Sequence, residues 1–135
     1  MTTSGNGKAI IAIGLIKRFG ALTAVNNLHL EVAPGEAFAL VGPDGAGKTT
    51  TIRLLTGIMD PDGGQAEVLG FDTVRDSEDL KEHIGYMPQR FGLYDDLTVG
   101  ENIAFFADIY RVGRAERRQR VPDLLNFANL APAAP

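Results

Sequence analysis

The chain has 135 residues, of which 44% are hydrophobic and 22% charged, and its net charge is −4. This composition suits one folded domain and disfavours disorder. The acidic balance disfavours nucleic-acid partners, which need a basic footprint, and the absence of cysteine excludes disulfides and thiolate metal sites.

The first apolar stretch, residues 9–16, is rich in β-branched residues and predicts a strand within residues 8–20. It is too short to span a bilayer. Lys8 precedes it, as a positive charge precedes the apolar part of a signal peptide, but no small-residue cleavage site follows. We therefore expect a soluble chain, with any membrane role coming through a partner.

Two further strands are predicted before a glycine-rich loop. Residues 23–32 alternate between apolar and polar side chains, which is typical of a half-buried strand. The apolar positions are Val25, Leu28, Leu30 and Val32. Residues 33–36 contain Pro-Gly and predict a turn. Residues 37–41 are apolar without interruption, which favours a strand buried on both faces of a sheet.

The loop at residues 42–49, GPDGAGKT, matches the pattern G-x-x-x-x-G-K-[ST] in full. Its glycines let successive backbone N–H groups point at an anion, and the helix that follows adds its positive dipole end. Lys48 can bridge the β- and γ-phosphates of a nucleotide, and the Thr49 hydroxyl can bind Mg²⁺. The expected nucleotide-binding residues here are Gly42, Asp44, Gly45, Ala46, Gly47, Lys48, Thr49 and Thr50.

The segment after the loop reads as a helix, a turn and a strand. Residues 48–59 predict a helix, and its apolar face would carry Ile52, Leu55 and Met59. Residues 60–64 contain Pro and two glycines and predict a turn. Residues 65–70 predict a short strand.

The second half of the chain is expected to be mainly helical. Asp76 or Ser77 can cap a helix within residues 76–84, and residues 84–89 predict a short strand that runs into a loop. Residues 97–112 predict a helix, because Thr98 and Glu101 have the spacing of a capping box. Its apolar stripe would be Val99, Ile103, Phe106 and Tyr110. Residues 114–130 predict one or two helices, interrupted near Pro122.

A phosphate loop alone is shared by kinases, GTPases and transport ATPases. GTPases normally read guanine with Asn-Lys-x-Asp, and this chain has no Asn-Lys pair. Residues 15–72 strongly resemble the start of an ATP-binding cassette (ABC) domain. Residues 84–110 resemble that family's glutamine loop and the beginning of its helical subdomain. The resemblance is greatest to the ATPase subunits of bacterial drug- or polysaccharide-export systems.

This resemblance implies an α/β fold of the P-loop NTPase type. The fold has three layers, an N-terminal antiparallel β subdomain and the start of a helical subdomain. Residues 1–135 would form the N-terminal part of one such domain, with the nucleotide-binding core at about 8–88 and the glutamine loop and helical subdomain at about 89–135. We expect the rest of the domain to be absent, which would leave apolar sheet edges bare and the isolated chain marginally stable or associated.

The resemblance also implies roles for single residues. Phe19 would stack on adenine, although an aromatic residue there could instead be an ordinary core residue at a strand end. Gln89 would contact Mg²⁺ or its water and sense the γ-phosphate, although it could instead be a solvated loop residue. Lys48 and Gln89 would be the catalytic residues, and Thr49 and Gln89 the metal-binding ones. The segment at residues 90–99 would help to form the groove for a membrane subunit.

One residue departs from the family pattern. Asp44 stands where the family usually has Asn, although the GPDGAGKTT form occurs in export cassettes. A carboxylate that faces the γ-phosphate would be repelled unless a proton or a cation lies nearby.

Other parts of the family's catalytic machinery have only partial imitations here. Residues 104–108, AFFAD, copy the first half of a Walker B segment, but no Asp-Glu pair follows and the spacing is helical. Residues 62–65, DGGQ, copy the end of the signature motif but are expected to form a turn before a strand. His29 and His83 come too early for the switch histidine, so we expect ordinary surface or strand histidines.

A run of arginines could bind acidic lipid or a partner, but a solvated helix face is the simpler interpretation in an acidic chain. The run is Arg111, Arg114, Arg117, Arg118 and Arg120.

The resemblance thus implies an ATP-binding subunit that hydrolyses ATP in the complete protein, with ATP and Mg²⁺ as ligands. Its partners would be a transmembrane permease subunit and a second ABC ATPase domain, with no nucleic acid, and its location the inner face of the cell membrane. Two alternatives remain open. The chain could bind nucleotide or a partner without turnover, or it could belong to a soluble ABC protein of translation or DNA repair.

Overall fold

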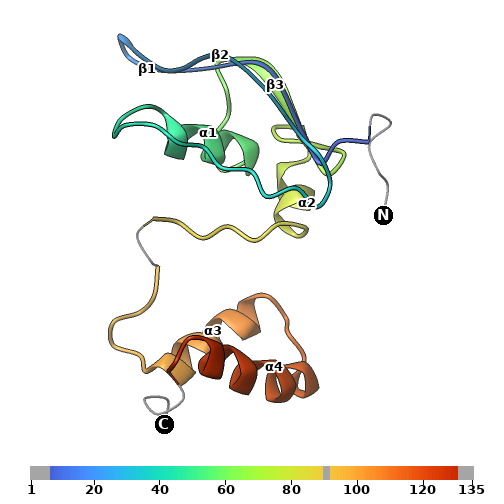
Figure 1. The fold of residues 1–135 in the computed structure, drawn as a ribbon, viewed down its shortest axis with the longest axis vertical. Coiled ribbons are helices and arrows are strands. Elements are labelled where there is room, and N and C mark those ends of the chain that lie inside the picture. Colours follow the sequence, from blue (N-terminus) through green and yellow to red (C-terminus); the bar gives the residue numbers. More distant parts are fainter. Residues whose placement is uncertain (1–6, 90–91, 131–135) are drawn as a thin grey trace. The chain divides into compact units, whose positions relative to one another are not determined.

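The computed structural model describes residues 7–89 and 92–130. These residues fall into two compact units, which divide between Tyr86 and Met87 (Figure 1). The first unit holds a β-sheet with two helices, and the second holds two helices. No helix in the described part of the chain is both long and apolar enough to cross a membrane.

The sheet of the first unit is antiparallel throughout, which confirms the predicted N-terminal antiparallel subdomain. Its strand order is β2-β1-β3-β4. The strands are β1 (Ile10–Phe19), β2 (Leu22–Val32), β3 (Gly63–Val68) and β4 (Phe71–Asp72). The two long strands therefore lie where the apolar and alternating segments predict them.

Bulges explain why the apolar positions of β2 are not evenly spaced. Leu15 pairs with Leu28 and Lys17 pairs with Val25, so β2 has one residue more than β1 between these pairs. Asn27 lies in that stretch with a left-handed φ of 51°, a conformation that Asn tolerates better than most residues. The extra residue lets Val25 and Leu28 both contribute to the core side.

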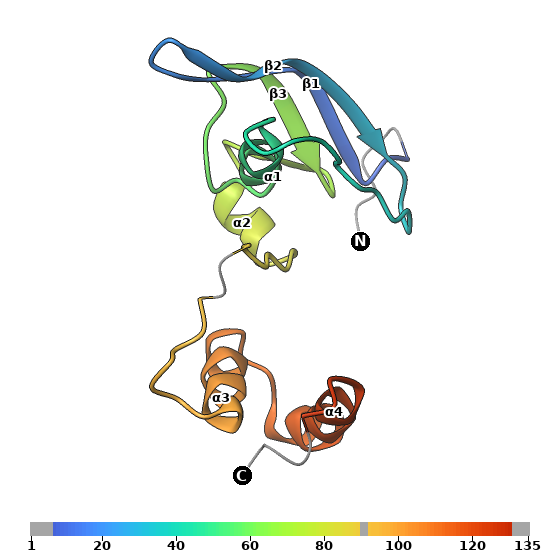
Figure 2. The same cartoon turned by 60° about the vertical axis from the view of Figure 1, so that its left-hand side comes forward.

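Helix α1 (Lys48–Leu55) lies along one face of the sheet, and α2 (Ser77–Lys81) closes one end of the core (Figure 2). Leu15 of β1, Leu54 of α1 and Leu80 of α2 are completely buried. Burying a leucine stabilises a fold by roughly 1.5–3 kcal/mol. These side chains therefore hold the phosphate-loop helix against the hairpin of β1 and β2.

Helix α1 is shorter than predicted and faces the core differently. It ends at Leu55 because Gly57 adopts a left-handed φ of 65° and the N–H of Ile58 returns to the carbonyl of Arg53 at 3.0 Å. Met59 therefore lies beyond the helix, although it still packs against the core. Ile52 was predicted on the buried face but is 41% exposed.

Two predicted strands are absent from the structure. Residues 37–41 and 84–89 form no strand, and within the described ranges no neighbouring strand offers them ladder hydrogen bonds. An apolar sequence alone cannot make a strand without such a partner. Val41 is accordingly 92% exposed.

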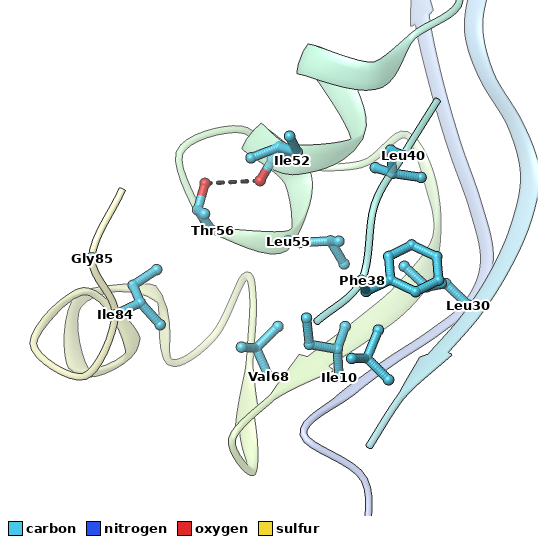
Figure 3. A pocket seen from close by; sticks show the side chains of 11 residues that line it. Ile10, Leu30, Phe38, Leu40, Ile52, Leu55, Thr56, Val68, Ile84 and Gly85 are labelled. Atoms are coloured by element: carbon cyan, nitrogen blue, oxygen red, sulfur yellow. Dashed lines mark hydrogen bonds between the residues drawn. The ribbon is translucent and has the colours of Figure 1, made fainter. Parts of the chain in front are cut away.

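An open apolar groove of about 320 Å³ runs beside the first of these segments. Phe38 and Leu40 line it together with Ile52 and Leu55 of α1 and Ile10 of β1 (Figure 3). Ile52 is partly exposed because its side chain lines this open groove, where its neighbours are apolar.

The second unit contains α3 (Val99–Ile109) and α4 (Arg114–Phe127). The predicted capping box is present, because the Thr98 hydroxyl accepts the N–H of Glu101 and the Glu101 carboxylate accepts the N–H of Thr98. The prediction of an interruption near Pro122 is wrong, since α4 continues through it. The helix is exposed there, so water can satisfy the carbonyl that Pro122 leaves unpaired.

A buried amide holds the second unit together. The Asn102 side chain is on a residue only 7% exposed, accepts the N–H of Tyr94 at 2.9 Å and donates to the carbonyls of Tyr94, Leu97 and Thr98. The four bonds fix the segment before α3 against the helix.

We expect Asn102→Leu to destabilise this unit by about 1–3 kcal/mol, because the N–H of Tyr94 and the carbonyl of Leu97 lose the partly buried hydrogen bonds that Asn102 makes to them. Amide hydrogen exchange of residues 92–110 would measure the loss of protection. Asn126→Leu on the exposed side of α4 is the matched control and should leave that protection unchanged. An equal loss of amide protection in Asn102→Leu and Asn126→Leu would contradict the role of Asn102 in holding the segment before α3.

Two carboxylates of the first unit make its stability depend on pH. The N–H of Arg18, and then Lys17, hold the pKa of Asp62 below its ordinary 3.8, and the N–H of Arg75 does the same for Asp72. A pKa lowered by folding adds stability above the unfolded value, and this contribution is lost as the pH falls through the folded value. The free energy of unfolding should therefore fall as the pH drops below about 5.

Urea unfolding at neutral pH and at about pH 3 checks this expectation. Asp72→Asn should flatten the pH dependence, since it removes one of the two carboxylates. Parallel pH profiles for the parent and the variant would show that Asp72 does not contribute.

Candidate functional site

The glycine loop of residues 42–47 leads directly into the N-terminus of α1. Gly45 and Gly47 have φ values of 78° and 85°, which only glycine adopts easily, and Gly47 is the N-cap residue of the helix. A short turn forms inside the loop, where the N–H of Ala46 lies 3.3 Å from the carbonyl of Pro43. The loop therefore has the left-handed bends that turn backbone N–H groups toward one side.

The loop packs tightly against the hairpin of β1 and β2. A Cβ atom at Gly47 would lie 2.2 Å from the carbonyl oxygen of Ala24 in β2, so only glycine fits there. This contact joins the loop to the end of the hairpin, where Phe19 pairs with Leu22. Ala24 is not among the predicted site residues, because a contact through a backbone carbonyl leaves no mark in the side-chain pattern.

Lys48 spans the loop. Its Nζ atom donates to the carbonyls of Gly42 and Pro43, both at 2.7 Å. The ammonium therefore sits over the bend of the loop, held by two of its three possible hydrogen bonds.

The start of α1 suits an anionic ligand. Its first turn carries no acidic residue, so nothing there offsets the positive dipole end. Thr49 is exposed and Thr50 half-buried, whereas Thr51 points into the core with 6% exposure. The glycine bends, the ammonium and the exposed hydroxyl of Thr49 are a donor set that fits a triphosphate with a hard cation such as Mg²⁺.

Two other predicted residues of this unit are accessible. Phe19 ends β1 and is 46% exposed, so it is not a core residue. Its ring centroid lies 5.9 Å from the Nζ atom of Lys17. Asp44 is exposed in the loop, where its carboxylate adds a negative charge beside the anion-binding groups.

Gln89 lies in the second unit, just after the division at Tyr86 and Met87. The first unit therefore holds Phe19, the loop and the start of α1, whereas Gln89 belongs to the second unit. Arg90 and Phe91, in the segment predicted to face a membrane subunit, lie outside the described residues.

Most of the segments that only partly imitate the family's catalytic motifs are ordinary parts of the fold. Residues 104–108 lie inside α3, so they are not a Walker B strand. His29 is an exposed residue of β2, and the Nδ1 atom of His83 lies 2.8 Å from the carbonyl of Asp79. The expected turn at residues 62–65 is only partly right, because β3 already begins at Gly63.

The arginine run contributes to local ion pairs. Arg117 pairs with Asp108 at 2.6 Å and Arg120 pairs with Glu116 at 2.6 Å. These contacts agree with a solvated helix face.

Comparison with known proteins shows the family. Residues 25–134 match the family model described as ABC transporter. The Probable multidrug ABC transporter ATP-binding protein YbhF of Escherichia coli (strain K12) is 46% identical over 94% of this chain and 22% of its own length. The Sulfate/thiosulfate import ATP-binding protein CysA of Gloeobacter violaceus is 39% identical over 91% of this chain and 36% of its own length. The chain thus spans between about a fifth and just over a third of these relatives.

A solved structure supports the same assignment. The ATP-binding cassette MJ0796, as a dimer in a post-hydrolysis state with ADP and Pi, superposes with a TM-score of 0.73. The identity is 26%, and the match covers 89% of this chain and 57% of that one. The fold is that of the corresponding part of an ABC ATPase P-loop domain, as expected from the resemblance. The chain therefore belongs to the ABC transporter family of ATP-binding proteins.

Proposed function

We propose that the chain binds the triphosphate of ATP in the loop of residues 42–50. The observation that carries this proposal is the arrangement of the loop around Lys48. Its ammonium is fixed across the bend by the Gly42 and Pro43 carbonyls, and next to it lies the N-terminus of α1, whose first turn carries no acidic residue. Both features favour the negative charge of phosphate.

The remaining site residues take the roles that the family resemblance implies. Phe19 stacks on adenine, and the Thr49 hydroxyl and the Gln89 amide oxygen hold Mg²⁺. The ion neutralises phosphate charge when it is bound. Support for Phe19 comes from its exposed ring at the end of the hairpin that touches the loop. Because Gln89 lies in the other unit, its role rests on the resemblance alone.

For the complete protein we propose ATP hydrolysis that powers a membrane transporter. Its partners are a second ABC ATPase domain and a transmembrane permease subunit, so that it works in the cytoplasm at the inner face of the membrane. MJ0796 is a dimer in its solved structure, which supports the first partner. The identity of 46% to a multidrug transporter protein, against 39% to an import protein, supports export.

A second candidate function is nucleotide binding without turnover. It applies to the 135-residue chain taken alone, whose sequence contains no Asp-Glu pair, the pair that carries the general base in the resemblance. Lys48 can stabilise phosphate charge, but water still needs a base to accept its proton. Phosphate release by the 135-residue chain would exclude this candidate.

Equilibrium titration with Mg-ATP tests the proposal directly. We expect one molecule of ATP per chain and competition by Mg-tripolyphosphate, which shares the phosphates but lacks the base. Absence of saturable binding would overturn the proposal.

Asp44→Asn is expected to tighten ATP binding. The substitution removes a negative charge from the loop that would hold the phosphates. At an exposed site a like charge at about 4 Å costs about 1 kcal/mol, which is roughly fivefold in affinity. The gain should shrink as salt is raised, because ions screen exposed charges.

Asp79→Asn removes an exposed charge on α2 and serves as the matched control. Unchanged affinity in Asp44→Asn at low salt would show that the carboxylate does not face the bound phosphates.

A further inference from the structure

One carboxylate links the turn before β3 to the end of β1. The Asp62 carboxylate accepts the backbone N–H of Arg18 at 2.6 Å and the Lys17 ammonium at 3.1 Å. The Asp62 N–H in turn donates to the carbonyl of Ile16 at 2.8 Å. Asp62 therefore bonds to three consecutive residues of β1, the last of which precedes Phe19.

The bonds from Asp62 begin where the pairing between β1 and β3 ends. The ladder between β1 and β3 stops at the pair Ile16 and Gly63, whereas β1 continues to Phe19. Beyond Ile16, β2 is the one strand among the described residues that pairs with β1, so the end of β1 has no β3 residue opposite it. The Asp62 side chain replaces that neighbour at Arg18, because it occupies the N–H that a strand would have used.

Lys17 connects the same carboxylate to the aromatic ring. Its side chain is only 16% exposed, and its Nζ atom also donates to the carbonyl of Asp60 at 2.7 Å. The ammonium lies 5.9 Å from the centroid of Phe19, within the range of a cation–π contact. The turn at residues 60–62 thus holds the Lys17 ammonium beside the Phe19 ring and also holds the backbone of Arg18, which precedes Phe19.

The opposite side of the hairpin is fixed by the phosphate loop, through the contact of Gly47 with Ala24. Because Thr23 pairs with Arg18, the residue that Asp62 holds is directly opposite the strand segment that the loop holds. The end of the hairpin is therefore clamped from two sides.

We propose that Asp62 is a positioning residue for the nucleotide base, which acts by holding Phe19 at a fixed distance from the phosphate loop. The inference rests on the proposed function, in which Phe19 stacks on adenine. Asp62 touches no part of the nucleotide in this account. Its removal weakens base stacking and leaves phosphate binding intact.

A double-mutant cycle between Asp62→Ala and Phe19→Ala tests the inference. Phe19→Ala should weaken Mg-ATP binding by about tenfold, the usual loss when an aromatic partner of a base is removed. Asp62→Ala should weaken it by about threefold to fivefold, because the ring remains but is less well held. In the Phe19→Ala background, Asp62→Ala should have no further effect.

Mg-tripolyphosphate supplies the readout that a general loss of structure would move. Its affinity should be the same in the parent chain, in Asp62→Ala and in the milder Asp62→Asn. Asp79→Ala, which removes an exposed carboxylate on α2, is the matched control and should bind both ligands as the parent does.

Failure of the proposed role of Asp62 can be told apart from failure of the proposed ATP binding. An equal effect of Asp62→Ala with and without Phe19, a parallel loss of tripolyphosphate binding, or no effect on ATP would overturn the inference and leave the proposed function standing. A parent chain that binds neither ATP nor tripolyphosphate would overturn the proposed function and the inference with it.

Discussion

Lys48→Ala is expected to weaken Mg-ATP binding by roughly tenfold to a hundredfold, the range for losing a charged hydrogen-bond donor to a charged partner. The Lys48 ammonium lies over the bend of the glycine loop, held at 2.7 Å by the carbonyls of Gly42 and Pro43. It is the cationic side chain nearest in sequence to the anion-binding backbone. Titration of the variant with Mg-ATP gives the affinity directly.

The same substitution should barely change folding. Both carbonyls that Lys48 holds belong to exposed residues, so water can replace the ammonium at a cost of about 1 kcal/mol or less. Lys81→Ala removes an exposed lysine of α2 and is the matched control. If Lys48→Ala bound ATP as tightly as Lys81→Ala, the loop would not be the phosphate site.

Gly64→Ala should have the largest effect on stability, a loss of about 3 kcal/mol or more in the free energy of unfolding. Gly64 is in β3 with a φ of 76°, and a Cβ atom there would lie 2.2 Å from the carbonyl oxygen of Gly14. That oxygen belongs to the backbone of β1, so neither strand can move without breaking ladder bonds. The left-handed conformation adds about 1–2 kcal/mol for any residue with a Cβ.

Gly20→Ala separates these two effects. Gly20 has a similar φ of 58°, but a Cβ atom there would have no neighbour within 4 Å. Its substitution should therefore carry only the conformational penalty of about 1–2 kcal/mol. Urea unfolding of both variants makes the comparison, and equal losses would show that the close approach of β1 and β3 contributes nothing.

Local patterns predicted the parts of the fold that local interactions determine. The Thr98 and Glu101 capping box, the Pro34–Gly35 turn and the two long strands each depend on residues close in the chain, and each is present. The predicted phosphate loop is also a local pattern, since its glycines and Lys48 lie within eight consecutive residues, and its role in binding phosphate stays a prediction.

Two errors are local, because α1 ends early at Gly57 and α4 continues through Pro122. The other errors fall where the outcome depends on residues far away in the sequence. Residues 37–41 have the composition of a buried strand but lack a strand to pair with among the described residues. The contact between Gly47 and Ala24 and the bonds from Asp62 to the end of β1 join segments far apart in sequence. Such contacts use backbone groups or a single carboxylate, and no periodic pattern reveals them.

Thermal unfolding of the 135-residue chain with and without Mg-ATP tests the central claim most directly. A ligand that binds only the folded state stabilises it by about 2.7 kcal/mol at a hundredfold excess over its dissociation constant. We predict that the first unit, which holds the loop of residues 42–50, unfolds in one cooperative transition. Mg-ATP should raise the temperature of this transition by several degrees, roughly in proportion to that stabilisation. A cooperative transition at the same temperature with and without Mg-ATP would contradict the account, since it would mean a folded loop that binds no nucleotide.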